Sequence, residues 1–550
     1  MDTVKKRGLK KDMIEYGIEE EIRELVLSKS KSDLDREADA KYLDDPTQPG
    51  TYRQKLLTMM EVDGTQTDRD IMVMRQLSRL MKMFDWGDHT FDIQEDHLRF
   101  IVSHIREYVR VGEVEKKEHG EVMTPLWLVE EMLDKLPEHV WSDPSLKWLD
   151  PCNGCGVYPS IVISRLMEGL KESFPDQRER YRHIVENMIH VCDIQAKNCF
   201  LHMVAFDPKN LFDMNIYCGS FLDEGFDKVA KEVWGIEKFD IVIGNPPYQE
   251  MKGLHSMAAK SIYHLFCQKS FDISKKTLMI IPSRWFNGSP GLSKFKKEMQ
   301  TSKKVSIINT FDENKFVFGK EVDIKGGVCY FLYDHEYQGM CSLNGTMVKL
   351  DKYDIVLRDY GFSSIVDKTT LHTPLSDICN SKSYYKILNN DKSLTEKKVS
   401  NTDLIVYLAK MKGGKKFIDR SLVSSECVYD SYKVMTAKAA HGGYSGVAKC
   451  FIANPDEICT ETYMHFQVGS LKQAKNLKRI LETKTLNVLV SLRKNTHNLK
   501  PDVFRWFPNL DLNLEWDDEK LYSFLKLTKK EISLIEEAAA NIKGAHKKTS

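Results

Sequence analysis

One short turn combines groups that could bind and orient a reacting molecule. In FDIVIGNPPYQE, residues 239–250, an apolar segment runs directly into Asn245, Pro246, Pro247 and Tyr248. Each proline fixes its backbone φ at about −65° and supplies no N–H donor. The turn therefore presents a side-chain amide, rigid carbonyl acceptors and a phenol, none of which a sheet requires. It is a candidate catalytic turn, although an ordinary proline turn would also fit these residues.

A second turn, DPCNGCGVYP, is rich in glycine. It follows the apolar segment LKWLD and precedes the helical pattern YPSIVISRLMEGL. Gly154 and Gly156 permit close approach, and the helix start offers free N–H groups, as a nucleoside cofactor requires. The same glycines would equally serve a tight corner. Cys152 and Cys155 form a CxxC pair, but no second pair follows at zinc-site spacing, so we predict no metal site.

Apolar strands alternate with helical segments through this part of the chain. MIHVCDI closes on Asp193, NIYCGSFL contains Ser220, and VDIKGGVCYFLYD, residues 322–334, is predicted to end with the final strand. Such alternation predicts a parallel sheet with its sites at the carboxyl ends of the strands. Asp150, Asp193, Ser220 and Asn245 should lie along that edge. Asp193 could bind a ribose hydroxyl pair or, equally, cap the next helix.

The motifs GEVMTP, LDPCNGCGVY, CDI, GSFL and IVIGNPPY, in this order, resemble those of the S-adenosylmethionine-dependent amino-methyltransferases. They are most similar to the adenine-N6 DNA methyltransferases, a group that includes the methylase part of type IIG restriction enzymes and phage or orphan modification enzymes. The resemblance covers about residues 115–335. It implies an α/β fold with a Rossmann-like, doubly wound methyltransferase sheet.

The resemblance also implies that the cofactor is S-adenosyl-L-methionine. The cofactor-binding residues carried over by position are Thr124, Pro125, Asp150, Gly154, Gly156, Asp193, Ser220 and Phe221. Thr124 and Pro125 would lie near the methionine end, although Thr as a helix N-cap with Pro in the first turn would explain both. Relatives usually carry Phe where this chain has Met123 and often carry Asp where it has Ser220.

Catalysis would fall to Asn245, Pro246, Pro247 and Tyr248 by the same resemblance. The Asn245 side-chain oxygen and the Pro246 carbonyl would accept hydrogen bonds from the N6 amine of adenine. Its lone pair, otherwise delocalised into the ring, would then point at the sulfonium methyl. Tyr248 would stack on a base flipped out of the duplex. Phe318 is a second stacking candidate, although a core position would explain it equally.

A chain of 550 residues is longer than one hydrophobic core usually serves, so several domains are predicted. We expect a helical N-terminal accessory region at 1–110, the catalytic domain at 111–335, a mixed α/β DNA-recognition domain at 336–515 and C-terminal helices at 516–550. Residues 401–510 hold 17 Lys and Arg against 9 Asp and Glu, although the whole chain is neutral. This excess predicts contact with double-stranded DNA.

Aromatic residues are interleaved with these cations, as in many nucleic-acid interfaces. They are Tyr444, Tyr463, Phe466, Phe504 and Trp506. The segments 438–449 and 491–501 are predicted to be loops that could enter a DNA groove. A solvated basic face is the alternative explanation for the charge.

The predicted function is methylation of adenine N6 at specific sites in duplex DNA, in a restriction-modification or phage or orphan setting. A restriction or specificity subunit would be the protein partner. The alternatives are a combined methylase and nuclease, methylation of RNA guanine or protein glutamine, and a DNA-reading subunit without catalysis. No apolar run reaches about 18 residues, and the start turns acidic where a signal peptide would be apolar. We therefore expect a cytoplasmic protein without membrane contact, whose scattered cysteines are mostly buried free thiols.

Overall fold

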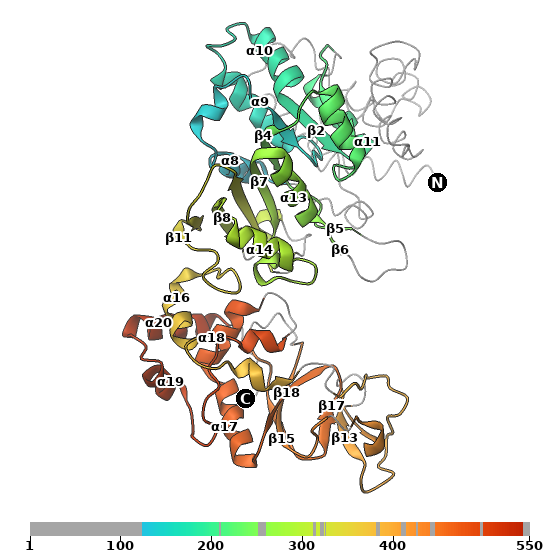
Figure 1. The fold of residues 1–550 in the computed structure, drawn as a ribbon, viewed down its shortest axis with the longest axis vertical. Helices are drawn as coiled ribbons and strands as arrows, with labels where there is room; N and C mark the ends of the chain where they lie inside the picture. Colours follow the sequence, from blue (N-terminus) through green and yellow to red (C-terminus); the bar gives the residue numbers. More distant parts are fainter. Residues whose placement is uncertain are drawn as a thin grey trace, which may run out of the picture. The chain divides into compact units, whose positions relative to one another are not determined.

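A computed structural model describes most of the chain after residue 123. The described residues are 124–207, 211–250, 260–311, 315–318, 324, 326–380, 385–408, 414–424, 427–439, 446–494 and 499–542. The predicted N-terminal accessory region and Tyr444 lie outside them. The chain divides into two units, Met1–Lys349 and Leu350–Ser550, and Figure 1 labels many of their elements.

A nine-stranded sheet forms the centre of the first unit. Its strand order is β11-β10-β8-β9-β7-β4-β1-β2-β3. The strands are β1 Trp148–Asp150, β2 Ile189–Asp193, β3 Asn215–Cys218, β4 Phe239–Gly244, β7 Ser274–Pro282, β8 Val305–Phe311, β9 Val328–Asp334, β10 Cys341–Leu343 and β11 Thr346–Val348. The five strands from β7 to β3 are parallel, while β9 runs antiparallel to both β7 and β8. The predicted mostly parallel α/β sheet is confirmed.

Helices connect these strands (Figure 1). They are α8 Leu126–Leu133, α9 Val157–Gly169, α10 Gln177–His183, α11 Ala196–Phe206, α12 Glu224–Lys228, α13 Tyr263–Ile273, α14 Ser293–Thr301 and α15 Lys315–Phe318. A short hairpin of β5 Gln249–Glu250 and β6 Lys260–Ser261 follows the proline turn. The prediction that β9 is the final strand is wrong, because the β10–β11 hairpin follows it and extends the sheet beside β8.

The inner strands are apolar because they are covered on both faces. Every residue of β1 and β2 is buried, and in β4 only Asp240 is partly exposed. Parallel strands of this kind read as continuous apolar runs instead of alternating ones. From β1 the chain builds β2 and β3 on one side, then crosses to β4 on the other. The strand order thus reverses between β1 and β4, and α/β proteins usually bind ligands outside the carboxyl ends of the strands at such a point.

The second unit contains two smaller sheets and several helices. One sheet has the order β12-β18-β15-β16 and the other β14-β13-β17. The strands are β12 Cys379–Asn380, β13 Leu404–Tyr407, β14 Lys415–Ile418, β15 Tyr432–Ala437, β16 Phe451–Ala453, β17 Glu457–Cys459 and β18 Tyr463–Val468. The helices are α16 Ser363–Thr369, α17 Leu471–Leu481, α18 Lys484–Arg493, α19 Asp518–Phe524 and α20 Lys529–Asn541. The unit is mixed α/β, as predicted.

Three of the aromatic residues predicted to accompany DNA-facing cations belong instead to the core of this unit. Phe466 and Phe504 are fully buried and contact each other edge to face, and Trp506 is 2% exposed. Tyr463 is partly buried against a second cluster. The spacing of these aromatic residues therefore reflects packing inside the second unit.

All twelve cysteines are free thiols, and all except the partly exposed Cys152 are buried, which confirms that prediction. Within the described part of the chain, none of the helices is long and apolar enough to span a lipid bilayer.

A buried arginine holds the end of α18 to the start of the unit. The Arg493 guanidinium donates to both carboxylate oxygens of Asp354 at 2.8 and 2.7 Å and to Asp502 at 2.7 Å, and its side chain is 1% exposed. It also lies 4.6 Å from the centre of the Trp506 ring. Arg493 falls in one of the predicted groove loops, but its cation is already neutralised inside the protein.

Replacing Arg493 with Met should lower the free energy of unfolding of the second unit by about 3–5 kcal/mol, because Asp354 would keep a partly buried charge without its main partner. Arg505 is a matched control, since it approaches the same two carboxylates at 3.7 and 3.9 Å but is 57% exposed. Arg505→Met should cost less than about 1 kcal/mol. Urea unfolding of both variants measures the difference, and equal losses would contradict the assignment of Arg493 as the buried partner.

Candidate active site

The proline turn begins directly after β4, and its side-chain amide is held by a residue far away in sequence. The Asn245 Nδ2 group donates a hydrogen bond to the Thr124 hydroxyl at 3.1 Å. Thr124 is 3% exposed and lies immediately before α8. With its nitrogen engaged in this way, the amide presents Oδ1 as its acceptor atom.

The prediction that Thr124 caps the helix is wrong, because its hydroxyl contacts Asn245 instead. Helix α8 starts at Leu126 with Pro125 at the N-cap position, and no side chain caps it. The Pro125 carbonyl accepts from the backbone N–H groups of Leu128 and Val129. Pro125 therefore shapes the start of α8, while Thr124 points its hydroxyl at the turn after β4.

Asp150 lies beside this turn at the end of β1. The Asp150 side chain is 2% exposed, and its Oδ1 accepts from the Cys152 backbone N–H at 3.1 Å. Its Oδ2 is buried and accepts no hydrogen bond from the described residues. Burial, together with the nearby charge of Asp193, raises the pKa of Asp150 to about 8. A buried acceptor of this kind suits a cationic ligand.

Gly244 allows the two strand ends to approach. A Cβ atom at this position would lie 2.9 Å from Asp150 Oδ1 and 3.2 Å from Cys152 Sγ. Real Cβ atoms do not approach that closely, so any side chain would push the β1 turn away from the β4 turn. Our sequence interpretation did not include Gly244, although a glycine directly before Asn-Pro-Pro-Tyr was a visible signal.

The glycine-rich turn is fixed to β2 through Asp193. The Gly154 N–H donates to Asp193 Oδ2 at 2.8 Å, and the Gln195 N–H donates to Asp193 Oδ1 at 2.8 Å. Asp193 thus orders the turn at the edge where it was predicted to lie. It is not the N-cap of α11, because that position belongs to Gln195, which makes no capping bond.

Gly156 starts α9 with a left-handed backbone, at φ 80°. A Cβ there would lie 2.9 Å from the Phe206 ring, so the position requires glycine on two grounds. In the same turn, Asn153 Oδ1 lies 3.1 Å from His202 Nδ1. Our sequence interpretation missed this contact because the two residues are 49 positions apart.

The segment after β3 reaches the same edge. Gly219 donates its N–H to the Asp193 carbonyl at 2.9 Å, which places Ser220 next to the end of β2. The Ser220 hydroxyl accepts from the Leu222 N–H at 3.2 Å. The Phe221 ring is 1% exposed and stacks on Phe266 with 5.5 Å between ring centres.

The remaining candidates differ in exposure. Pro246 is buried and Pro247 is half-buried, while Tyr248 is 7% exposed and its ring meets Tyr263 edge to face. Burial raises the pKa of Tyr248 well above its ordinary value, so the phenol stays neutral. Phe318 is half-buried at the end of α15. The structure thus gathers Thr124, Asp150, the glycine turn, Asp193 and the proline turn at one sheet edge.

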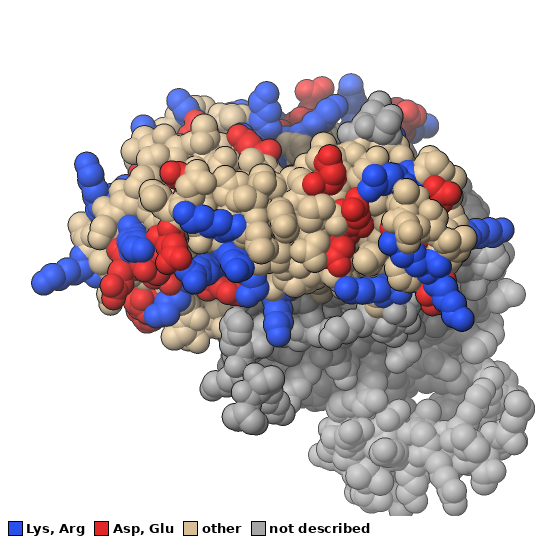
Figure 2. All heavy atoms as spheres, turned by 90° about the horizontal axis from the view of Figure 1, so that it is seen from below, with Lys and Arg blue, Asp and Glu red and all other residues tan. Residues whose placement is uncertain are grey.

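Most of the described cations in residues 401–510 are paired with carboxylates or buried within the second unit. Lys433 is fully buried and donates to the Tyr429 and Ser431 carbonyls, and most other cations pair with carboxylates, as Lys416 does with Glu396. Among the described residues of this range, the cations that form no ion pair and are exposed are Lys449, Lys472, Lys475 and Lys500. Figure 2 accordingly shows positive and negative side chains interspersed over the face in view.

The ends of the two predicted groove loops are joined by hydrogen bonds. The Leu499 N–H donates to the Lys438 carbonyl at 2.8 Å, and the Lys494 ammonium donates to the Gly446 carbonyl at 3.2 Å. The Thr436 hydroxyl donates to the Ala448 carbonyl at 3.0 Å. Segment 438–449 therefore follows β15, and segment 491–501, which follows α18, is bonded beside the end of that strand. Their central residues, 440–445 and 495–498, lie outside the described part of the chain.

Comparison with known proteins identifies a methylase domain. Residues 168–318 match the family described as Eco57I restriction-modification methylase. This range includes Asp193, Ser220, the proline turn and Phe318, but not Thr124 or the glycine turn. The chain is also 29% identical to an uncharacterized adenine-specific methylase of Mycoplasma pneumoniae, in an alignment that covers 42% of this chain and 72% of the relative.

Solved structures are more distant. A modification subunit of a putative type I restriction enzyme from Vibrio vulnificus is 13% identical, with a TM-score of 0.32, over 53% of this chain and 55% of that chain. The type ISP restriction-modification enzyme LlaGI is 11% identical, with a TM-score of 0.47, over 85% of this chain and 52% of that chain. The chain thus spans about half the length of these two proteins, and the scores are too low to assign a function.

The family match covers the carboxyl ends of β2, β3 and β4 and the proline turn. Residues 168–318 form an Eco57I-type restriction-modification methylase domain, and the chain is a homologue of an adenine-specific methylase.

Proposed function

We propose that this protein transfers a methyl group from S-adenosyl-L-methionine to the exocyclic N6 of an adenine flipped out of duplex DNA, at specific sequences. The observation that carries the proposal is the Asn245 amide, held through its nitrogen by Thr124, beside the buried Asp150 carboxylate. The family match and the adenine-specific relative support methyl transfer to adenine.

The cofactor fits the residues at the ends of β1 and β2. Asp150 has a buried oxygen without a hydrogen-bond partner among the described residues, which suits a ligand with a positive charge. Gly154 and Gly156 have positive φ angles of 53° and 80°, a backbone conformation that residues with side chains rarely adopt. Asp150 and these glycines would hold the amino-acid and sulfonium portion, and Asp193 with Ser220 would lie toward the ribose. When bound, S-adenosyl-L-methionine supplies an electrophilic methyl group.

The residues of the proline turn would make the amine a better nucleophile. The Asn245 Oδ1 atom and the Pro246 carbonyl would accept the two N–H groups of the amine, which draws its lone pair out of conjugation with the ring. Thr124 keeps the amide from rotating, so Oδ1 stays the acceptor. Preorganised acceptors of this kind stabilise positive charge that develops on the nitrogen, and no strong base is required before attack. Tyr248, neutral because it is buried, would offer its ring to the flipped base.

The second unit would recognise DNA. Lys449 and Lys500 are exposed, have no ion pair with any described residue, and each directly follows a residue bonded to the end of β15. Phosphate contacts by such lysines would position the duplex, while loops beside them would read bases. We propose this surface as the DNA contact of the unit, and a restriction or specificity subunit as a further partner of the protein.

The first prediction concerns methyl transfer itself. Wild-type protein should transfer labelled methyl from S-adenosyl-L-methionine to unmethylated duplex DNA, and digestion should yield N6-methyladenine. Asn245→Ala should lower kcat by about 10²–10³-fold, because one acceptor for the amine is lost. Thr124→Val, which leaves the amide unanchored, should lower kcat by about tenfold, and Thr124→Ser should restore it.

Other outcomes of this assay have distinct meanings. Transfer to RNA or protein instead of duplex DNA would contradict the DNA assignment but leave the amine chemistry in place. Equal kcat values for wild type and Thr124→Val would contradict the positioning role of Thr124. Cleavage of unmethylated DNA with magnesium would reveal a combined methylase and nuclease.

A second prediction follows from the raised pKa of Asp150. In the ligand-free protein the carboxyl is largely protonated below pH 8, and a cationic ligand requires the carboxylate. The affinity for S-adenosyl-L-methionine should therefore rise up to tenfold per pH unit between about pH 6 and 8 and then level off. Calorimetry should show proton release on binding. S-adenosyl-L-homocysteine, whose sulfur is uncharged, should show a weaker pH dependence.

Asp150→Asn provides the control for that experiment. Burial holds the pKa of Asp150 in the folded protein above its value in the unfolded chain. The wild type therefore loses stability as the pH rises from about 4 to 8. Because asparagine does not ionise, the variant should melt at a higher temperature than the ligand-free wild type at pH 8. It should also bind the cofactor weakly at every pH. A variant that binds as tightly as wild type, with the same pH profile, would contradict the role of Asp150.

A third prediction tests the DNA surface. The double substitution of Lys449 and Lys500 by Ala should weaken duplex binding and reduce the slope of log K against log salt by about 2, one for each lost phosphate contact. The matched control is the same change at Lys472 and Lys475, which are equally exposed on α17 but are not at the loop ends. Fluorescence anisotropy across a salt series measures both, and equal slopes for the two double variants would contradict the assigned surface.

A further inference from the structure

Helix α13 touches two separate parts of the candidate site. Its start is joined to the proline turn, because the Ile262 N–H donates to the Tyr248 carbonyl at 3.3 Å and the rings of Tyr248 and Tyr263 meet at 6.5 Å. One turn farther along, Phe266 stacks on Phe221 after β3. The helix therefore lies between the catalytic turn and the segment that would hold the nucleoside of the cofactor.

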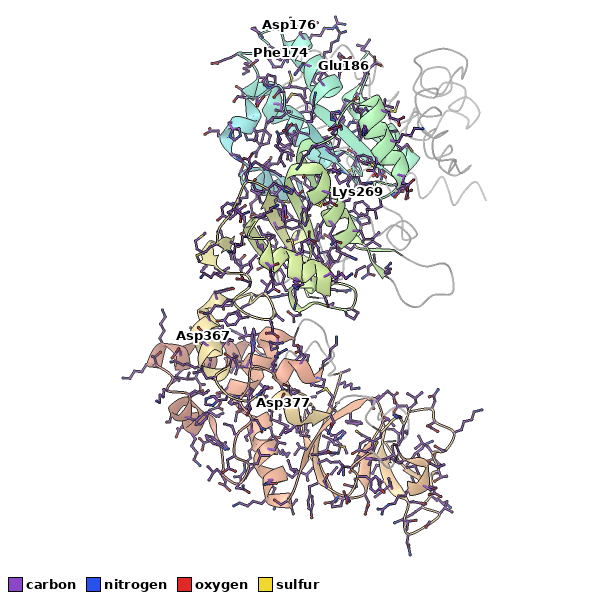
Figure 3. All side chains as sticks on the ribbon, in the orientation of Figure 1. Phe174, Asp176, Glu186, Lys269, Asp367 and Asp377 are labelled. Carbon is purple, nitrogen blue, oxygen red and sulfur yellow. The ribbon has the colours of Figure 1, made fainter. Side chains whose placement is uncertain are left out.

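Lys269, which is labelled in Figure 3 and lies one turn beyond Phe266, makes polar contacts with the same segment. Its ammonium pairs with Asp227 at 2.7 Å and donates to the Asp223 carbonyl at 3.3 Å. It also lies 5.2 Å from the ring centres of both Phe221 and Phe226. The Lys269 side chain is only 16% exposed. One cation thus contacts a carboxylate, a carbonyl and two aromatic faces, all on the segment after β3.

The segment held in this way is tied to the cofactor edge. Gly219 bonds to the Asp193 carbonyl, and Ser220 and Phe221 follow it directly. The Phe221 ring contacts Phe266 and also contacts Phe226, with 4.9 Å between the centres of the Phe221 and Phe226 rings. Because Lys269 contacts both Phe221 and Phe226, loss of its charge would loosen the position of the Ser220–Phe221 backbone relative to Asp193.

We propose that Lys269 is a positioning residue for cofactor binding: it fixes the segment from Ser220 to Asp227 on α13 and so joins the nucleoside end of the cofactor site to the catalytic turn. The proposal rests on the proposed function, because it assumes that this edge binds S-adenosyl-L-methionine. It assigns no contact between Lys269 and the reacting atoms. The residue acts through Phe221 and the backbone beside Ser220.

The test uses the full chain and measures binding before activity. Lys269→Met keeps the aliphatic stem but removes the cation, and it should weaken S-adenosyl-L-homocysteine binding about tenfold by calorimetry, as expected for loss of a half-buried cation–π and ion-pair contact. KM for S-adenosyl-L-methionine should rise by a similar factor, while kcat at saturating cofactor and KM for DNA change less than about threefold. Lys269→Arg, which keeps the charge, should restore most of the affinity.

Two matched variants sharpen the test. Lys228→Met removes the lysine that directly follows this segment, at the end of α12. Because Lys228 is 70% exposed and reaches Glu232 at only 4.0 Å, the variant should bind the cofactor as wild type does. Asp227→Asn should weaken binding less than Lys269→Met, because the aromatic contacts and the Asp223 carbonyl remain. In the double variant of Lys269 and Asp227 the losses should not add, since one interaction is removed twice.

The possible outcomes distinguish a failure of the proposed function from a failure of the role proposed for Lys269. If wild type binds neither S-adenosyl-L-methionine nor S-adenosyl-L-homocysteine, the proposed function fails and this inference fails with it. If wild type binds and Lys269→Met melts lower yet binds with an unchanged Kd, Lys269 serves only stability and the inference is overturned while the proposed function stands. Should Lys269→Met not fold, Asp227→Asn decides, because an unchanged Kd in that variant would also overturn the inference.

Discussion

The closeness of the β1 and β4 strand ends is the constraint on which the rest of the site depends. At Gly244 the backbone lies where a Cβ would meet both the Asp150 carboxylate and the Cys152 thiol. That approach removes Asp150 from water and raises its pKa to about 8. A buried acid with one oxygen lacking a hydrogen bond destabilises the ligand-free fold. Proteins retain such groups mainly where a ligand will use them.

The loops at this edge are fixed to one another instead of standing independently. Asp193 holds the glycine turn through its carboxylate and the Gly219 N–H through its backbone carbonyl. Asn245 is held by Thr124 across 121 positions of sequence. Each bond joins a loop to the strand end next to it, so the polar groups keep their positions before any ligand arrives. The proposed catalysis by hydrogen-bond acceptors, without a strong base, would depend on that rigidity.

Much of this arrangement could be predicted from sequence, because it follows from strand pattern. The buried apolar strands that end on Asp150, Asp193 and Gly244 are continuous and short, and polar residues at their carboxyl ends must share an edge. The role of Thr124 could not be predicted in this way. A Thr-Pro pair before a helix has the local pattern of a cap, and only the folded sheet brings its hydroxyl to Asn245. β8 was equally hidden, since VSIINTF mixes apolar and polar residues and lies beside an antiparallel neighbour.

The second unit shows why charge counted along a sequence is a weak guide to a binding surface. Composition records the number of cations, whereas DNA binding depends on cations that are exposed and have no carboxylate partner. Arg493 is a strong cation buried among two carboxylates, and Lys433 is buried against backbone carbonyls, so neither can meet a phosphate. Arg493 and Lys433 lie in the same cation-rich part of the sequence as Lys449 and Lys500. Only the folded structure separates them, because burial and pairing are set by residues such as Asp354, more than a hundred positions away.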